Sequence, residues 1–141
     1  MIPIKIVGTG LYAPGKPIDN IELKKLAEIE FNHEKIAGKI GIKKRHIARL
    51  RGIEETTADF VTHAAQNAIK DAAINPDEIG LFIVATDTPE YITPATALIV
   101  QGRIQKGEKW SMSFDVAASC ASFTMAFDVA SRILSSNSLI K

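Results

Sequence analysis

The chain has 141 residues, of which 46% are hydrophobic and 23% charged, and its formal net charge is +1 at pH 7. This balance is typical of one globular domain and argues against nucleic-acid and membrane partners. One cysteine excludes an internal disulfide and a CxxC zinc site, and no apolar run reaches membrane-spanning length, so we expect a cytoplasmic protein without a metal.

The first part of the chain predicts a strand, a glycine turn and a helix. Isoleucines alternate with other residues over residues 2–6, and the glycines of residues 7–10 end the strand. A dinucleotide-binding loop would need a third glycine and a following helix, and both are missing. Asp19 or Asn20 is expected to cap the first helix.

Residues 35–51 form the most basic segment of the chain. They contain seven Lys or Arg residues together with His46, and no Asp or Glu. Such a run is most often a solvated face. The alternative is an anion site, for phosphate groups or for an acidic protein partner.

The clearest predicted helix begins near residue 56. Thr56 and Asp59 have the spacing of a capping box, and residues 75–76 (Asn-Pro) stop the helix. Between them lies a face of small residues suited to close packing. The continuous apolar run over residues 79–85 then predicts a strand buried on both sides.

The rest of the chain alternates again between helix and strand. Thr93 is expected to cap a helix that has Pro94 in its first turn and extends to Ile104. Residues 112–116 read as a short strand. This order of elements predicts a layered α/β domain with at least partly parallel strands.

Cys120 stands among small residues where that strand turns into a further helix, whose apolar face includes Phe123 and Phe127. A thiol at a helix N-terminus lies in the field of unpaired N–H groups, which favours the nucleophilic thiolate. The alternative is an inert buried cysteine, the commoner case for a free thiol. A redox sensor would usually need a second, resolving cysteine, which the chain lacks.

Four segments occur in an order and spacing that resemble a known family. Residues 7–10, 41–48, 83–86 and 114–123 together look like the N-terminal half of β-ketoacyl-acyl-carrier-protein synthase III, a condensing enzyme of the thiolase superfamily. The resemblance implies a thiolase-like layered α/β fold, with helices packed on a mixed, partly parallel sheet. Residues 1–141 would be a truncated N-terminal domain, with the C-terminal half absent.

The resemblance also implies a reaction. An acyl group passes from coenzyme A to Cys120, and malonyl-acyl-carrier protein then undergoes a decarboxylative Claisen condensation with the resulting thioester to give a 3-ketoacyl product. The Cys120 N–H matches the family's oxyanion donor. No resident cofactor is implied; the partners are acyl carrier protein, acyl-coenzyme A and a second subunit in a homodimer.

The family's catalytic histidine and asparagine lie in the half that this chain lacks. We therefore expect the fragment alone to be inactive and to leave an apolar sheet edge uncovered. We also expect the natural gene product to continue beyond Lys141.

Several positions depart from the family pattern. Ser122 stands where the family has glycine, and Ser119 where it often has alanine. Lys35 and Lys39 stand where the family often has the tryptophan and arginine that hold coenzyme A; a lysine can contact a phosphate but cannot stack on adenine. Arg45, in the segment 41–48, is also expected to contact the substrate.

Thr93 replaces a phenylalanine that in the family limits the partner subunit's acyl tunnel. This replacement predicts a roomier pocket and a primer longer than acetyl. Two other functions stay open. One is another thiolase-fold condensing enzyme, a hydroxymethylglutaryl-coenzyme-A synthase or a type III polyketide synthase. The other is a non-catalytic subunit that binds a carrier protein.

Overall fold

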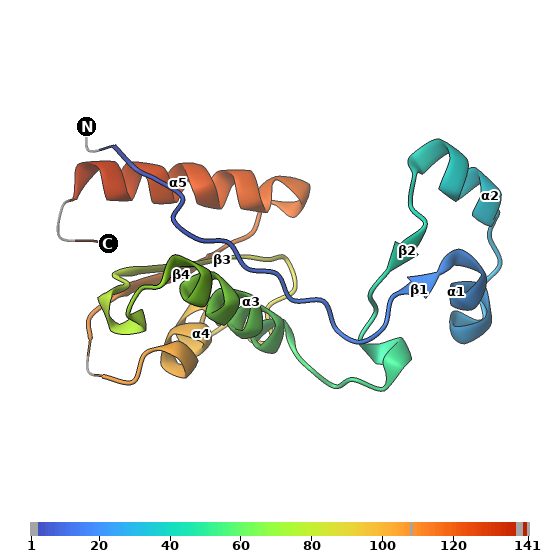
Figure 1. The fold of residues 1–141 in the computed structure, drawn as a ribbon, viewed down its shortest axis with the longest axis horizontal. Helices are drawn as coiled ribbons and strands as arrows, with labels where there is room; N and C mark the ends of the chain where they lie inside the picture. The colour runs from blue at the N-terminus through green and yellow to red at the C-terminus, as the bar shows by residue number, and fades with distance from the viewer. Residues whose placement is uncertain (1–2, 108, 138–139, 141) are drawn as a thin grey trace. The chain divides into compact units, whose positions relative to one another are not determined.

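The computed structural model describes residues 3–107, 109–137 and 140, and these residues form two compact units. The larger unit combines the residues up to Tyr12 with those from Thr56 onward, and the smaller unit is Ala13–Glu55. Each unit has its own pair of strands (Figure 1). No helix in the described part of the chain is both long and apolar enough to cross a membrane.

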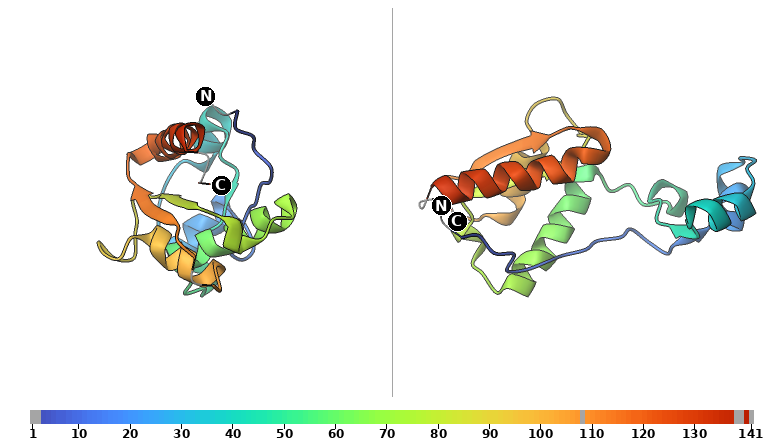
Figure 2. Two further views of the ribbon diagram at one scale, coloured as in Figure 1. Left: turned by 90° about the vertical axis from the view of Figure 1, so that its left-hand side faces the viewer. Right: turned by 90° about the horizontal axis from the view of Figure 1, so that it is seen from above.

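A parallel two-stranded sheet lies at the centre of the larger unit. Strand β3 (Leu81–Ala85) pairs with β4 (Met112–Val116), with Leu81 opposite Met112 and Ala85 opposite Val116. Helices cover both faces, α5 on one and α3 with α4 on the other (Figure 2). Their bounds are α3 Thr57–Ala72, α4 Thr96–Ile104 and α5 Ser122–Ser136. The predicted parallel pairing and the layered α/β arrangement are both confirmed.

The core of this unit lies on the α3–α4 side of the sheet. Phe82 and Val84 of β3 are buried there against α4, whose Val100 is only 1% exposed. Leu81 and Ile83 point to the α5 side and are half-buried. The prediction of a strand buried on both sides was therefore wrong, because α5 leaves an apolar hollow of about 730 Å³ over the second face of β3.

Helix α3 begins with the predicted capping box. Thr56 Oγ1 accepts a hydrogen bond from the Asp59 N–H at 3.3 Å, and the Asp59 carboxylate accepts from the Thr56 N–H at 2.7 Å. The helix ends at Ala72, where Ala73 adopts a left-handed conformation, and a 3₁₀ turn (Pro76–Glu78) follows. The Asn-Pro pair therefore stands just beyond the helix end, as predicted.

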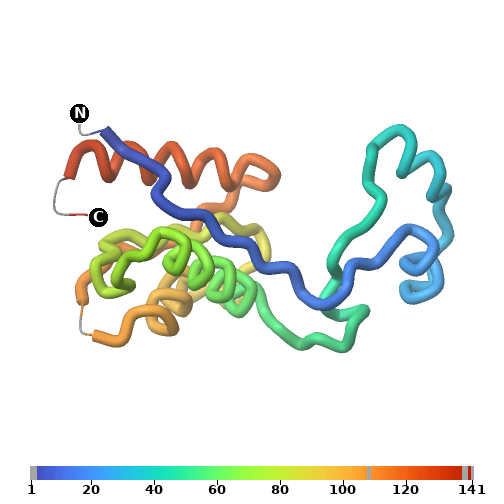
Figure 3. The backbone as a smooth tube through the Cα atoms, in the orientation of Figure 1, coloured from blue at the N-terminus to red at the C-terminus, as the bar shows by residue number. Residues whose placement is uncertain are grey.

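The N-terminal segment is extended but forms no strand. The strand predicted over residues 2–6 is wrong for residues 3–6, which pair with no strand in the described structure; residue 2 lies outside the described residues. The segment instead runs beside α3 (Figure 3), where the Thr9 N–H donates to Asp71 Oδ2 at 2.9 Å. A Cβ at Gly10 would lie 2.1 Å from the Ala64 carbonyl oxygen, so this close approach requires glycine.

The smaller unit is built around a short antiparallel pair, β1 (Ile18–Asp19) and β2 (Lys44–Arg45), with Ile18 opposite Arg45. Ile18 is fully buried. Asp19 caps the following helix by accepting hydrogen bonds from the first-turn N–H groups, which decides between the two predicted caps. The remaining elements are α1 (Asn20–Ala27), α2 (His33–Lys35), a π-helical turn (Ile36–Ile40) and a 3₁₀ turn (Arg49–Arg51).

Candidate active site

Cys120 lies in the connection between β4 and α5, within a 3₁₀ turn (Ser119–Ala121) that leads directly into the helix. Its thiol is free and exposed. The predicted position is therefore confirmed in outline, with the difference that a 3₁₀ turn separates the cysteine from the α-helix. Cys120 therefore lies at the edge of the sheet where the carboxyl ends of the parallel strands β3 and β4 meet.

Hydrogen bonds hold the connection around Cys120. The Ser122 hydroxyl donates to the Ser119 carbonyl at 2.8 Å and accepts from the Ala118 N–H at 2.8 Å. The Ser119 N–H donates to Asp87 Oδ1 at 3.1 Å, from the loop after β3. Ser119 itself has φ +49°, in the left-handed region that disfavours a non-glycine residue. The turn is therefore held by the side chains of two different elements.

The Cys120 N–H has no hydrogen-bond acceptor among residues 3–107, 109–137 and 140. An unpaired N–H next to an exposed thiol is the arrangement that nucleophilic acyl transfer requires. When sulfur attacks a thioester carbonyl, its oxygen becomes negative, and an adjacent N–H can stabilise that charge. The site thus places an exposed thiol beside an N–H that is available as a hydrogen-bond donor.

Asp115 connects the end of β4 to the start of α4, a contact that the sequence analysis does not predict. Its two carboxylate oxygens accept hydrogen bonds from the Thr96 N–H at 2.7 Å and the Ala97 N–H at 2.8 Å. Thr93 makes no side-chain cap, so its predicted capping role is wrong; α4 begins at Thr96 and takes its cap from β4. Nothing in the local sequence signals this contact, because the partners are 18 and 19 residues apart.

Two predicted substrate contacts lie in the larger unit and differ in exposure. Thr93 is exposed in the loop before α4. Ser122 is only 6% exposed, and its hydroxyl is bonded to the backbone of the Cys120 turn. The remaining three, Lys35, Lys39 and Arg45, belong to the smaller unit.

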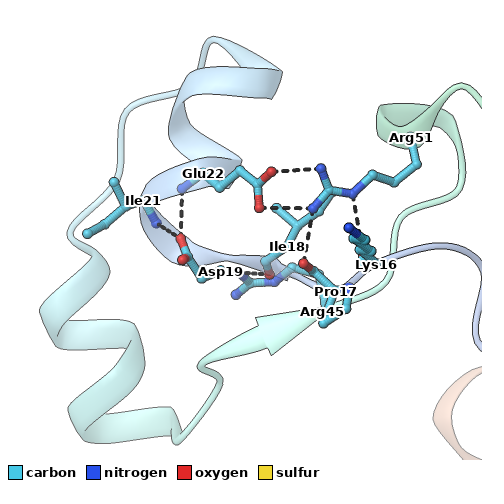
Figure 4. Close-up of polar contacts among 8 residues, drawn as sticks. All are labelled: Lys16, Pro17, Ile18, Asp19, Ile21, Glu22, Arg45 and Arg51. Atoms are coloured by element: carbon cyan, nitrogen blue, oxygen red, sulfur yellow. Dashed lines mark hydrogen bonds and ion pairs between the residues drawn. The ribbon is translucent and has the colours of Figure 1, made fainter.

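The basic segment of the smaller unit divides into structural and exposed side chains. Arg51 forms a two-pronged ion pair with Glu22 at 2.7 and 2.9 Å and also donates to the carbonyls of Lys16 and Pro17 at 3.0 Å (Figure 4). Because the Glu22 carboxylate accepts two hydrogen bonds from the guanidinium, the pKa of Arg51 is raised above its ordinary value.

Arg45 also contacts its own unit. Its guanidinium donates to the Ile18 carbonyl at 3.3 Å and to Asn20 Oδ1. Five basic side chains of the segment remain exposed: Lys35, Lys39, Lys43, Lys44 and Arg49. They leave the anion-site hypothesis open, and Arg45 and Arg51 contribute mainly to holding the unit together.

Within the described ranges, no three His, Cys, Asp or Glu side chains are grouped so that they could hold a metal ion. His46 Nδ1 lies 3.2 Å from the Pro14 carbonyl oxygen and 3.1 Å from that of Gly15, both within the smaller unit.

Comparison with known proteins identifies the relatives of this chain. No protein-family model matches it. The β-ketoacyl-[acyl-carrier-protein] synthase III of Clostridium acetobutylicum is 40% identical over 134 residues, which are 95% of this chain and 39% of that protein. The crystal structure of 3-oxoacyl-[acyl-carrier-protein] synthase III from Aquifex aeolicus matches with a TM-score of 0.81 and 36% identity, covering 94% of this chain and 40% of that one.

A tetronic acid condensing enzyme also matches, with a TM-score of 0.80 and 25% identity over 93% of this chain and 40% of its own. The resemblance to β-ketoacyl-acyl-carrier-protein synthase III and the thiolase-like fold are thereby confirmed. The chain spans about two fifths of the length of the curated relatives it matches.

Proposed function

We propose, from the confirmed resemblance to β-ketoacyl-acyl-carrier-protein synthase III, that the protein containing this chain is a condensing acyltransferase with Cys120 as its nucleophile. Two observations together carry the proposal. An exposed thiol, whose N–H has no acceptor among the described residues, lies where β4 leads into α5. The chain is also 40% identical over 134 residues to the synthase of Clostridium acetobutylicum. The reaction needs no resident cofactor.

The proposed reaction has two halves. The Cys120 thiolate forms a bond to the acyl carbon of acyl-coenzyme A, and the coenzyme A thiolate leaves with the electron pair of the broken C–S bond. Malonyl carried on acyl carrier protein then loses carbon dioxide, and its carbanion attacks the enzyme thioester. The 3-ketoacyl product stays on the carrier, and Cys120 is released as a thiolate. The Cys120 N–H stabilises the oxyanion in both halves.

The direct test is acylation of the complete protein. We expect incubation with acyl-coenzyme A to add one acyl group, which peptide mass spectrometry places on Cys120, and we expect Cys120→Ala to abolish it. Ser131→Ala, on the same helix, serves as the matched control that keeps full acylation. Acylation of Cys120→Ala at the wild-type rate would contradict the proposal.

Product analysis separates this function from its thiolase-fold alternatives. A ketoacyl synthase makes a 3-ketoacyl carrier from malonyl carrier, a hydroxymethylglutaryl-coenzyme-A synthase consumes an acetoacetyl donor, and a type III polyketide synthase extends malonyl-coenzyme A repeatedly. We expect only the first of these products.

A second candidate function is supported by the five exposed basic side chains of the smaller unit. A non-catalytic subunit could bind an acidic carrier protein through them. If this function holds, Cys120→Ala retains carrier binding in a pull-down and the wild-type protein shows no acyl transfer.

We further propose that the active protein contains a C-terminal half, forms a cytoplasmic homodimer and takes acyl carrier protein as partner. The length of the curated relatives supports the first point. An intact mass from the source cell well above double the 15.3 kDa of this chain is the expected result. A native mass of 15.3 kDa would contradict it and favour the non-catalytic subunit.

A further inference from the structure

We propose that Ser122 and Asp87 are positioning residues, which clamp the turn around Cys120 from two sides so that the Cys120 N–H stays available to a developing oxyanion. This inference rests on the proposed acyl transfer at Cys120. In the described part of the chain, both side chains are hydrogen-bonded to the backbone of the turn and neither to the thiol itself.

The first half of the clamp is the Ser122 hydroxyl. Ser122 is a buried polar residue at the start of α5, and its one hydroxyl both donates to the Ser119 carbonyl and accepts from the Ala118 N–H, each at 2.8 Å. These two backbone groups precede Cys120 by one and two residues. Because the hydroxyl is nearly sealed from water, water cannot easily replace it if it is removed.

The second half of the clamp is Asp87, in the loop that follows β3. Its Oδ1 accepts from the Ser119 N–H at 3.1 Å. Ser119 has φ +49°, a conformation that a residue with a side chain keeps only when its surroundings hold it. The two contacts therefore fix an unfavourable backbone conformation in the residue directly before the nucleophile.

A rotation at Ser119 would move the peptide that contains the Cys120 N–H. Acyl transfer depends on that donor, because the attack of Sγ on the carbonyl carbon places negative charge on the carbonyl oxygen. Alkylation by iodoacetamide does not depend on it: Sγ bonds to the methylene carbon, iodide leaves, and no oxyanion forms. Comparing the two reactions therefore separates the position of the N–H from the reactivity of the thiol.

The experiment uses the full-length protein with Ser122→Ala and Asp87→Ala. The single-turnover rate of acylation by acyl-coenzyme A and the rate of iodoacetamide alkylation across pH are measured for each. We expect acylation to fall about tenfold or more and the limiting alkylation rate at alkaline pH, where the thiol is fully ionised in every variant, to stay within about twofold. Asp87→Asn, which keeps an acceptor for the Ser119 N–H, is expected to restore acylation.

Ser131→Ala is the matched control, since the Ser131 hydroxyl also donates to a backbone carbonyl of α5, that of Phe127 at 2.7 Å, further along the helix from the turn. Wild-type acylation in both alanine variants, or equal losses in acylation and alkylation, would overturn the positioning role. If Ser122→Ala does not fold, Asp87→Ala and Asp87→Asn decide alone. An absence of acylation in the wild type would overturn the proposed function and the positioning role together, whereas unaffected variants of an acylated wild type overturn only the latter.

Discussion

Thr93 is the residue on which primer length is expected to depend. It lies exposed before α4, next to Ile92, whose side chain is fully exposed. The resemblance implies a phenylalanine at this position that narrows the partner subunit's acyl tunnel, and on that basis we expect threonine to leave more room. We predict that Thr93→Phe lowers the kcat/KM ratio of octanoyl- to acetyl-coenzyme A by roughly tenfold, since each lost methylene contact in an apolar pocket changes discrimination by that order.

The matched control for this prediction is Thr93→Ser, which keeps the small polar side chain and should leave the ratio within about twofold. Steady-state kinetics with both donors in the full-length enzyme provides the measurement. A wild-type enzyme that already prefers acetyl would show that Thr93 does not enlarge the pocket.

The site could be predicted from the sequence only where its signal was local. The sequence predicts the position of Cys120 at a strand-to-helix connection because the small residues, the preceding strand and the following helix all lie within one segment. Asp115 and Asp87 cannot be predicted in this way, because their partners, Thr96 and Ser119, lie 19 and 32 residues away in the sequence and meet them only in the folded structure. The residue type of Thr93 and its neighbour Pro94 predict a cap there, but the distant Asp115 accepts the hydrogen bonds from the first N–H groups of α4.

The capping box of α3 is an element whose contribution can be measured directly. The pKa of Asp59 is lowered, first by the hydrogen bond from the Thr56 N–H and then by the Thr56 hydroxyl, with the Arg103 ion pair at 3.1 Å adding to the effect. We predict that Thr56→Ala opens α3 about fivefold more often at pH 7, equivalent to about 1 kcal/mol for a lost cap. Hydrogen exchange of α3 peptides, followed by mass spectrometry, measures this opening.

The same carboxylate makes the stability of α3 depend on pH. Because the folded-state pKa of Asp59 is depressed, its stabilisation is fully present above the ordinary carboxyl range and is lost as the pH falls through the folded pKa. We predict that Asp59→Asn exchanges faster than wild type at pH 7 and that the two converge under acid conditions. A ratio of exchange rates that stays constant with pH would contradict this prediction.

The elements themselves followed from the sequence wherever the chain determines them locally. Helix α3 carries its cap, its small-residue face and its stop within one stretch, and its predicted extent agrees with Thr57–Ala72. The segment over residues 3–6 has equally clear alternation, yet it forms no strand, because a strand also needs an edge to pair with. Alternation predicts which face a segment would bury, but it does not supply the neighbouring strand.

The larger unit leaves apolar surface uncovered over one face of β3. The hollow of about 730 Å³ is lined by Leu81 and Ile83 of the strand and by Phe127 of α5. Phe123 and Phe127 stack with ring centroids 6.2 Å apart, and they are 74% and 47% exposed. Contiguous apolar surface of this kind is a site of association in solution.

We therefore predict that the 141-residue chain, expressed alone, binds an apolar dye such as anilinonaphthalene sulfonate and self-associates, as measured by fluorescence and by sedimentation velocity. Phe123→Ser should reduce both signals, because it removes the most exposed aromatic ring of α5.

The control is Arg132→Ser, at an exposed position on the same helix outside the hollow, which should leave both signals unchanged. At about 100 μM, weak association through an apolar surface is detectable. A chain that stays monomeric and binds no dye at this concentration would contradict the prediction. A protein that contains the proposed C-terminal half is expected to bind little dye if that half packs over the hollow, because burial would remove the apolar surface from water.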